Sequence, residues 1–304
     1  MSTPALSTPV SHHATSTAAA PAPHKVRGYW GTVGYRLRHD YVTLFFGLVL
    51  LIIVLCAILS PWLAPFDPYK ESIVRRLKMP GYMGHTLGTD ELGRDMLSRL
   101  LYGGRLTLLM GFVPVAVATV VGGGLGVIAG LLGGWVNTLI MRVMDVFYAF
   151  PSVLLAVAIS GAMGGGVGNA FIALSLVFIP PLCRVAETAT TQVRALDFVD
   201  AAKATGAPVL TVLWHHVLGN VLGPILVYAS GMISVGILLG SGLSFLGMGV
   251  KPPEPDWGLM LNTLRQAIYV NPLVAAMPGI AIFVTSVSIN MVSDGLRSAM
   301  DVRI

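Results

Sequence analysis

Long apolar blocks, separated by short polar stretches, set the pattern of this chain. Residues 41–63 carry no charged side chain, and neither do residues 106–141, a block of 36 residues. A membrane-spanning helix needs about 20 apolar residues, so the second block is too long for one span, and the pair Gly133-Gly134 divides it. The pattern predicts an all-α integral membrane protein with six transmembrane helices, near residues 41–63, 106–131, 136–160, 169–190, 219–247 and 273–293.

The segments around these blocks differ in composition. Residues 1–24 contain no Lys, Arg, Asp or Glu and are rich in Ser, Thr, Ala and Pro, which predicts a disordered N-terminal tail. Residues 25–40 are basic and aromatic, which predicts a cytoplasmic segment along the membrane interface. The transmembrane domain then covers residues 41–304 and contains two polar segments, 64–105 and 191–218.

The orientation of the chain depends on which signal is weighed more. Residues 25–38 hold four Lys or Arg and residues 64–105 hold seven, so the positive-inside rule alone places segment 64–105 in the cytoplasm. Counting spans gives the opposite result: if segment 191–218 is cytoplasmic, segment 64–105 is external and both termini are cytoplasmic. We prefer the second result, because segment 64–105 also carries five acids and has the composition of a folded loop.

Composition supports a membrane protein and excludes a nucleic-acid binder. The 304 residues are 55% hydrophobic and 11% charged, with a mean hydropathy of +0.77. Soluble domains are typically about 25% charged. The 35 glycines fit close helix packing in lipid. The net charge of +5 is spread over loops and forms no basic patch.

No pattern indicates chemistry carried out by this chain. There is no G-x-x-x-x-G-K-[ST] loop to hold nucleotide phosphates, no H-E-x-x-H and no nucleophile elbow. Cys56 and Cys183 lie inside apolar blocks, and His215 and His216, as neighbours on a helix, point in different directions. We therefore expect no catalytic residue, no metal site and no cofactor bound by this chain, and hence no enzyme.

Charged side chains near the apolar blocks have two interpretations. In the first polar segment, Asp90, Arg94, Asp95 and Arg99 alternate in sign, and a helical spacing predicts an Asp95–Arg99 ion pair. The alternative is contact with a partner protein through Asp90, Arg94 and Asp95. We expect Trp257, in the Pro-rich loop 251–258, at the membrane interface, where that loop serves as a gate, a docking surface or a plain connector.

Two further pairs lie at the ends of predicted spans. Arg142 and Asp145 are three residues apart in the third span, and Arg184 and Glu187 have the same spacing in the fourth. Such spacing predicts an ion pair within each helix. Charges within a span are costly, so a functional role stays open for both pairs.

The polar segment 191–218 contains the most informative motif, Asp200-Ala-Ala-Lys-Ala-Thr-Gly206, followed by His216-Val-Leu-Gly219. It predicts a short helix with an acid near its start and a glycine at its end. Small Ala201 and Ala202 would allow a partner surface to come close. Leu210, Leu213 and Trp214 would supply the apolar contacts of a helix lying in a groove. The alternative is an interfacial amphipathic helix without a partner.

Three segments together resemble a known family. They are Gly88–Arg105, the motif just described, and Leu243–Gly258 with Asp294-Gly-Leu-Arg297. Over residues 40–301 the chain resembles the permease subunits of peptide ABC importers, the branch for dipeptides, oligopeptides, glutathione and nickel, and within it the "C" partner of the DppC and OppC type. The resemblance implies the type I ABC importer permease fold. It also implies that segment 191–218 is the EAA loop, whose coupling helix lies in a groove of an ATP-binding subunit.

The resemblance further implies partners that the chain itself does not contain. They are a second permease of the DppB and OppB type, two ATP-binding subunits that hold ATP and Mg, an external solute-binding protein and the lipid bilayer of the inner membrane. The ATPase-coupling residues would be Asp200, Ala201, Ala202, Gly206, Leu210, Leu213, Trp214 and Gly219. The family usually has Glu where this chain has Asp200, and Pro where it has Gly219, which predicts a less rigid hinge.

The resemblance implies a small peptide as cargo, with nickel chelate or glutathione as the alternative. A channel or carrier that works without ATP is a remoter hypothesis, because such proteins usually place ionisable groups near the middle of the membrane. The predicted spans two, five and six contain no such group.

Overall fold

The computed structural model describes residues 29–300, and regular structure in that range is helical apart from two isolated β-bridges within residues 82–95. The predicted tail, residues 1–24, lies outside the described residues. The helices are α1 (Tyr29–His39), α2 (Tyr41–Ile58), α3 (Ser60–Leu63), η1 (Ile73–Arg75), α4 (Met96–Leu132), α5 (Gly134–Tyr148), α6 (Ser152–Ala162), α7 (Val167–Arg194), α8 (Asp197–Ala204), α9 (Val209–Val212), η2 (Leu213–Val217), α10 (Leu218–Phe245), α11 (Trp257–Thr263), η3 (Arg265–Tyr269) and α12 (Pro272–Met300).

Five stretches of the described chain are long and apolar enough to cross a membrane: α2, α4, α7, the run 209–245 that ends in α10, and α12. A sixth span results when α5 and α6 are taken together, although the two are bent by 86° at residues 149–151. The predicted six-span, all-α fold is thereby confirmed. Pro151 stands at this break, where a helix that continued from α5 would lose a backbone hydrogen bond.

The second span begins ten residues before its predicted start. α4 starts at Met96 rather than at residue 106, because a carboxylate oxygen of Asp95 accepts the backbone N–H of Ser98 at 2.8 Å and so caps the helix. Charged Arg99 and Arg105 are accommodated on this first part of α4 by contacts with other segments. The start of the apolar block at residue 106 is therefore not the start of the helix.

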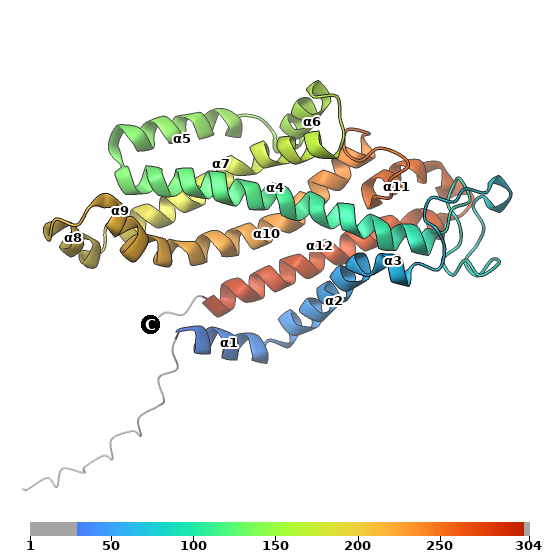
Figure 1. Cartoon of the computed structure of the whole chain (residues 1–304), viewed down its shortest axis with the longest axis horizontal. Coiled ribbons are helices and arrows are strands. Elements are labelled where there is room, and N and C mark those ends of the chain that lie inside the picture. Colours follow the sequence, from blue (N-terminus) through green and yellow to red (C-terminus); the bar gives the residue numbers. More distant parts are fainter. Residues whose placement is uncertain (1–28, 301–304) are drawn as a thin grey trace, which may run out of the picture.

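The long helices run along the length of the molecule, and the two polar segments lie at its opposite ends (Figure 1). α8 and α9 form one end. Residues 64–95 and α11 form the other, which we call the loop end. α1 and the last residues of α12 lie toward the α8 end. This placement agrees with the span count, which puts segments 64–105 and 191–218 on different sides of the membrane.

Small residues let the central helices come close together. On α4, Gly122, Gly126 and Gly130 repeat every four residues, and a Cβ atom at any of them would lie under 3.0 Å from a main-chain oxygen of α7. Those oxygens belong to Ile179, Cys183 and Glu187, which share the same spacing. Because lipid provides no hydrophobic drive for helix association, such backbone contact is a main source of packing energy.

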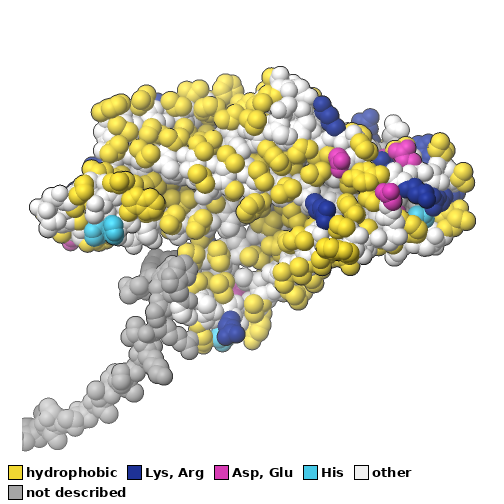
Figure 2. Space-filling view, viewed as in Figure 1, with side chains coloured by type: hydrophobic (Ala, Val, Ile, Leu, Met, Phe, Trp, Pro, Cys, Tyr) yellow, Lys and Arg dark blue, Asp and Glu magenta, His cyan; other side chains and the backbone are white. Residues whose placement is uncertain are grey.

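Side-chain types are distributed as a bilayer requires. Hydrophobic side chains cover the middle of the molecule, whereas Lys, Arg, Asp and Glu gather at the loop end (Figure 2). On α2, Phe45, Leu48 and Ile52 are all more than half exposed. This exposure matches a helix that faces lipid or a neighbouring apolar helix.

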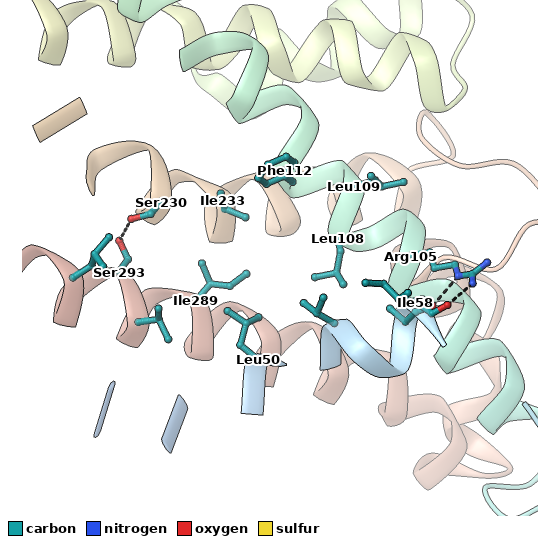
Figure 3. Close-up of a pocket in the computed structure, with 14 residues that line it drawn as sticks. Leu50, Ile58, Arg105, Leu108, Leu109, Phe112, Ser230, Ile233, Ile289 and Ser293 are labelled. Carbon is teal, nitrogen blue, oxygen red and sulfur yellow. Dashed lines mark hydrogen bonds between the residues drawn. The ribbon is translucent and has the colours of Figure 1, made fainter. Parts of the chain in front are cut away.

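An apolar groove of about 660 Å³ lies between α2, α4, α10 and α12 (Figure 3). Its polar groups are Arg105, which donates to the carbonyls of Ala57 and Ile58 at 2.7 Å each, and the mutually bonded hydroxyls of Ser230 and Ser293. Arg105 thus satisfies carbonyls at the end of α2 that have no helical partner. The groove therefore has few polar groups that could bind a polar solute.

Candidate functional site

The polar segment 191–218 folds into two short helices joined by a tight turn. α8 begins at Asp197, with Asp200 also in its first turn, and ends before Gly206, whose φ of +80° suits glycine. Pro208 then precedes α9. The motif therefore forms the expected short helix with its glycine stop, one turn longer at its start than the motif itself.

One face of this segment is anchored to the bundle. Val199, Val212 and Val217 are each at most 2% exposed. They form one apolar cluster with Val127 of α4 and Ala186 of α7. α8 and α9 are therefore held in place by the ends of the spanning helices.

The opposite face is bare. Leu210 is 65% exposed and Trp214 is 62% exposed, and Asp200 and Ala201 are exposed beside them. Of the other expected coupling residues, Ala202 and Leu213 are half-buried against the apolar cluster. Large apolar side chains left exposed on a polar segment are typical of a surface that binds another protein.

The junction between this segment and α10 is a π-helix, η2, at Leu213–Val217. π-Helical turns are rare and often occur at functional sites. Gly219 lies after this stretch, inside α10, so the departure from α-helical geometry falls before the residue expected to act as a hinge. His215 contacts the carbonyl of Thr211 through Nδ1 at 3.2 Å. Over residues 29–300, no three His, Cys, Asp or Glu side chains group as metal ligands would.

At the loop end, charged side chains are buried against one another. Arg94 Nε lies 2.7 Å from Asp90 Oδ2, and Arg94 also bonds Glu91 at 2.9 Å. Arg99 Nε lies 3.3 Å from the same Asp90 oxygen. The side chains of Asp90, Arg94 and Arg99 are at most 4% exposed, so these charges hold the loop together from inside.

Two expectations for this end need correction. Asp95 does not pair with Arg99: its carboxylate caps α4 and contacts His85 Nδ1 at 2.9 Å, while Arg99 donates to the carbonyl of Pro68 at 3.1 Å. Because Asp95 precedes the helix, its side chain turns back to the first turn and not along the helix face. Partner contact through Asp90, Arg94 and Asp95 is also wrong, since burial within this chain leaves them nothing to present.

Trp257 is likewise buried rather than placed at the membrane interface. It is 4% exposed, donates from Nε1 to the carbonyl of Leu100 at 2.9 Å, and packs on Gly103 and Gly104. Its neighbour Asp256 was missed by the sequence analysis. An aspartate directly before an apolar run is a helix-start signal that would have found it.

Asp256 is fully buried and joins two distant segments. One carboxylate oxygen accepts the hydroxyl of Thr107 at 2.7 Å, and the other caps α11 by accepting the N–H of Leu259 at 3.0 Å. Burial raises the pKa of Asp256, and these hydrogen bonds oppose the rise. The Pro-rich loop is thus fixed to α4.

The paired charges in the third and fourth spans are connected across helices. Arg184 lies 2.6 Å from Asp145, whereas Arg142 is 3.9 Å from it. Glu187 accepts from Asn137 of α5 at 2.6 Å and not from Arg184. The predicted Arg142–Asp145 pair is therefore present, as the longer of two contacts to that carboxylate. The predicted Arg184–Glu187 pair is replaced by contacts between α5 and α7, because these helices lie side by side (Figure 1).

The expected site residues thus divide between the two ends. The coupling set lies together at the α8 end, and the loop set lies together inside the loop end. The structure brings no member of one set to the other. Of the two, only the α8 end leaves its expected contact side chains open.

In sequence, this chain is similar to known families and proteins. Residues 122–304 match the model of the binding-protein-dependent transport system inner membrane component, and residues 28–80 match the N-terminal TM domain of oligopeptide transport permease C. The glutathione transport system permease protein GsiD of Pectobacterium atrosepticum is 37% identical over 91% of this chain and 92% of its own length. GsiD of Escherichia coli O6:K15:H31 is 36% identical, over 93% of each.

A solved structure of the MetNI methionine ABC transporter, in an inward-facing conformation, is similar in fold. The match has a TM-score of 0.57 at 17% identity and covers 67% of this chain and 97% of that chain. At this identity the similarity concerns the fold alone.

Proposed function

This chain belongs to the family of binding-protein-dependent transport system inner membrane components and is a permease subunit of an ABC importer; from that premise we propose that its 191–218 segment is where separate ATP-binding subunits act. As a member of this family it is a multi-pass protein of the inner membrane. Membership of the family does not determine which residues of this chain contact the ATP-binding subunits. It also leaves open which solute is transported and on which side of the membrane each terminus lies.

One observation carries the coupling proposal: α8 and α9 are anchored on one face by buried valines and bare on the other. An apolar surface of this kind becomes stable when a partner covers it. Asp200, Ala201, Leu210 and Trp214 would meet the groove of an ATP-binding subunit, and Ala202 and Leu213 would support them from the bundle side. Gly206 would end the coupling helix, and Gly219 would serve as the hinge into α10. The small side chain of Ala201 would let the partner approach the α8 backbone.

The energy for transport would come from ATP hydrolysis by partner chains. The sequence has no phosphate-binding loop, so ATP and Mg would be bound by two ATP-binding subunits. A second permease would complete the pathway, and an external binding protein would deliver the solute. Closure of the ATP-binding subunits would then shift the pathway between two access states, because nucleotide favours one of them.

We propose small peptides, glutathione among them, as the cargo. The similar proteins named above are glutathione permeases, and glutathione is itself a tripeptide. The match to an oligopeptide permease domain points to the same chemical class. A peptide carries both charges and apolar groups, so its pathway has to offer partners for both.

For the orientation, we propose cytoplasmic termini, an external loop end and a cytoplasmic α8 end. Cys56 and Cys183 are the natural thiols, so single cysteines introduced at Val74 and Leu210 provide the test. Both positions are more than half exposed. A membrane-impermeant thiol reagent should label Val74→Cys in intact cells. It should label Leu210→Cys only after the membrane is permeabilised. The reverse pattern would overturn the orientation.

The coupling proposal is tested by Ala201→Glu. Ala201 is exposed, so the added carboxylate can reach solvent and membrane insertion should be unchanged. In the assembled complex the added charge would lie in an apolar contact, and uptake of peptide should fall to background. ATPase activity should lose its dependence on binding protein. Ala201→Ser, which stays small and neutral, is the matched control and should keep uptake. Normal uptake by Ala201→Glu would contradict the proposal.

A further inference from the structure

The break between α5 and α6 opens a hollow in the middle of the bundle. It has a volume of about 180 Å³ and lies between α5, α6, α7 and α10. Its walls are largely apolar, with four aromatic side chains and two prolines of α7. They include Phe147, Tyr148, Phe150, Phe178, Pro180 and Pro181.

A charged cluster stands beside this hollow and shares a residue with it. The guanidinium of Arg184 lies 4.8 Å from the ring centre of Tyr148, which lines the hollow. Arg184 also contacts Asp145 at 2.6 Å, and Arg142 reaches the same carboxylate at 3.9 Å. Two guanidiniums thus share one aspartate. Glu187, one turn further along α7, is engaged by Asn137 and Thr191.

These charged side chains are exposed on the surface of this chain at positions within the spans, where contact of a charge with lipid is energetically unfavourable. The side chains of Arg142, Arg184 and Asp145 are 79%, 49% and 44% exposed. Arg184 lies ten residues before the end of α7, which corresponds to about 15 Å along the helix. Charges on a span face water or protein rather than hydrocarbon. In a permease that forms half of a pathway, this face is therefore the one that meets the solute or the second half.

The two prolines leave two carbonyls of α7 without the N–H that would normally bond them. Pro180 and Pro181 have no N–H, so the carbonyls of Leu176 and Val177 receive no helical hydrogen bond from them. Val177 itself lines the hollow. The site thus combines guanidinium donors, an aromatic wall and backbone acceptors, which are the groups that a short peptide needs for its carboxylate, side chain and N–H.

We propose that this hollow, together with Arg184 beside its Tyr148 wall and the Arg142 that shares Asp145 with Arg184, is a binding subsite for the carboxylate end of the transported peptide. The proposal rests on the proposed function and names a residue set for it. A planar guanidinium binds a carboxylate through two parallel hydrogen bonds. The ligand carboxylate exchanges with Asp145 for the guanidiniums, so binding is reversible, as transport requires.

The test uses the assembled complex, with its second permease, ATP-binding subunits and binding protein, in proteoliposomes. The probes are a tripeptide, glutathione, and its C-terminal amide. The binding protein is the same throughout, so a change in the acid-to-amide uptake ratio reports on the permease. Arg184→Gln should lower uptake of the acid about tenfold, the loss expected for one charge-assisted hydrogen bond, and leave the amide nearly unchanged.

Two further variants separate an effect on this subsite from a general effect of charge. Asp145→Asn removes the competing carboxylate and keeps both guanidiniums, so it should lower the KM for the acid and raise the ratio. Arg194→Gln is the matched control: it removes the same charge from the same helix, but Arg194 contacts the Gly130 carbonyl and not the hollow, so the ratio should stay as in the unmodified complex.

Ratios unchanged in both Arg184→Gln and Asp145→Asn, in a complex that takes up glutathione, would overturn the subsite alone. A ratio lowered equally by Arg194→Gln would also overturn it, since the effect would then be one of general charge. Failure of the unmodified complex to take up either probe would instead refute the peptide cargo, and the subsite with it.

Discussion

The two ends of this permease treat charge and apolar surface in opposite ways. At the loop end, Asp90, Arg94 and Arg99 are buried together, and Asp95 and Asp256 cap the starts of α4 and α11 with their side chains. At the α8 end, α8 and α9 have no side-chain cap, and the Asp200–Lys203 ion pair is exposed.

The difference indicates which end is complete on its own. A buried ion network holds its shape only when every member is paired, and at the loop end the members come from one chain. At the α8 end the exposed Leu210 and Trp214 leave apolar surface uncovered. Substitutions at the loop end should therefore act on stability, and substitutions at the α8 end should act on assembly. Four predictions test this division, in order of decreasing effect.

The largest effect is expected from Asp90→Ala. It leaves Arg94 and Arg99 buried without their shared carboxylate, and losing one partner of a buried ion pair costs about 3–5 kcal/mol in the free energy of unfolding. Denaturant unfolding of the purified protein in detergent measures this cost. Glu71→Ala is the control, because Glu71 is 56% exposed and 3.8 Å from Arg94, and it should cost under about 1 kcal/mol. Equal costs would show that burial is not what gives the network its strength.

Trp214→Ala should give the second largest effect, and on assembly only. Since Trp214 is exposed, the free energy of unfolding should change by less than about 0.5 kcal/mol. Removing an aromatic anchor should weaken binding of the ATP-binding subunit by about 2 kcal/mol, roughly 30-fold. Titration of the purified subunits measures the dissociation constant. Trp62→Ala, on the more exposed Trp62 near the loop end, should leave this dissociation constant unchanged. A dissociation constant unaltered by Trp214→Ala would place the contact elsewhere.

The third effect is a pH dependence confined to the loop end. Burial raises the pKa of Asp256 in the folded protein, so the folded state holds that proton more tightly than the unfolded state. The resulting stability is fully present below the unfolded pKa of about 3.9 and is lost as pH rises through the higher folded pKa. Burial likewise raises the pKa of Glu91, and the two contributions share their sign.

Melting temperatures measured from pH 4 to pH 7 test this prediction. Asp256→Asn removes the titrating group, so its melting temperature should fall less over this interval than that of the unmodified protein. Asp67→Asn changes an exposed aspartate elsewhere in the loop end and should keep the original slope. Parallel curves for all three proteins would mean that Asp256 keeps its ordinary pKa in the folded state.

The smallest effect is expected from Lys203→Gln at the α8 end. The Asp200–Lys203 pair spans three residues at 3.0 Å, but its side chains are 69% and 43% exposed, and such helical pairs contribute about 0.3–0.5 kcal/mol. Arg94→Gln breaks a pair of similar length that is buried, and should cost several times more in the same unfolding measurement. A Lys203→Gln cost equal to that of Arg94→Gln would remove the contrast between the two ends.

The sequence was sufficient for the spans and for the short helix, because both follow from local patterns. Uninterrupted apolar residues determine α2 and α12, and the alanines with Gly206 determine α8. The start of α4 escaped prediction, since Arg99 is neutralised by Asp90 and by the carbonyl of Pro68, contacts that depend on how the loop folds.

Contacts between distant segments account for the other misses. Thr107 and Asp256 are 149 residues apart, and Arg184 finds Asp145 rather than Glu187 because α5 lies against α7. Spacing along one helix gives the candidates for a pair but not the choice among them. The bare face of α8 and α9 was predictable in outline, whereas Val199, which anchors α8, became apparent only from the fold.

The glycine contacts between α4 and α7 have a mechanical consequence. With backbones this close along Gly122, Gly126 and Gly130, any larger residue at these positions would force the two helices apart. α7 leads directly into α8, and α4, 37 residues and about 55 Å long, continues to the opposite face of the bilayer. We therefore expect α4 and α7 to move as one unit, so that a displacement of α8 also moves the end of α4 that lies near the loop end.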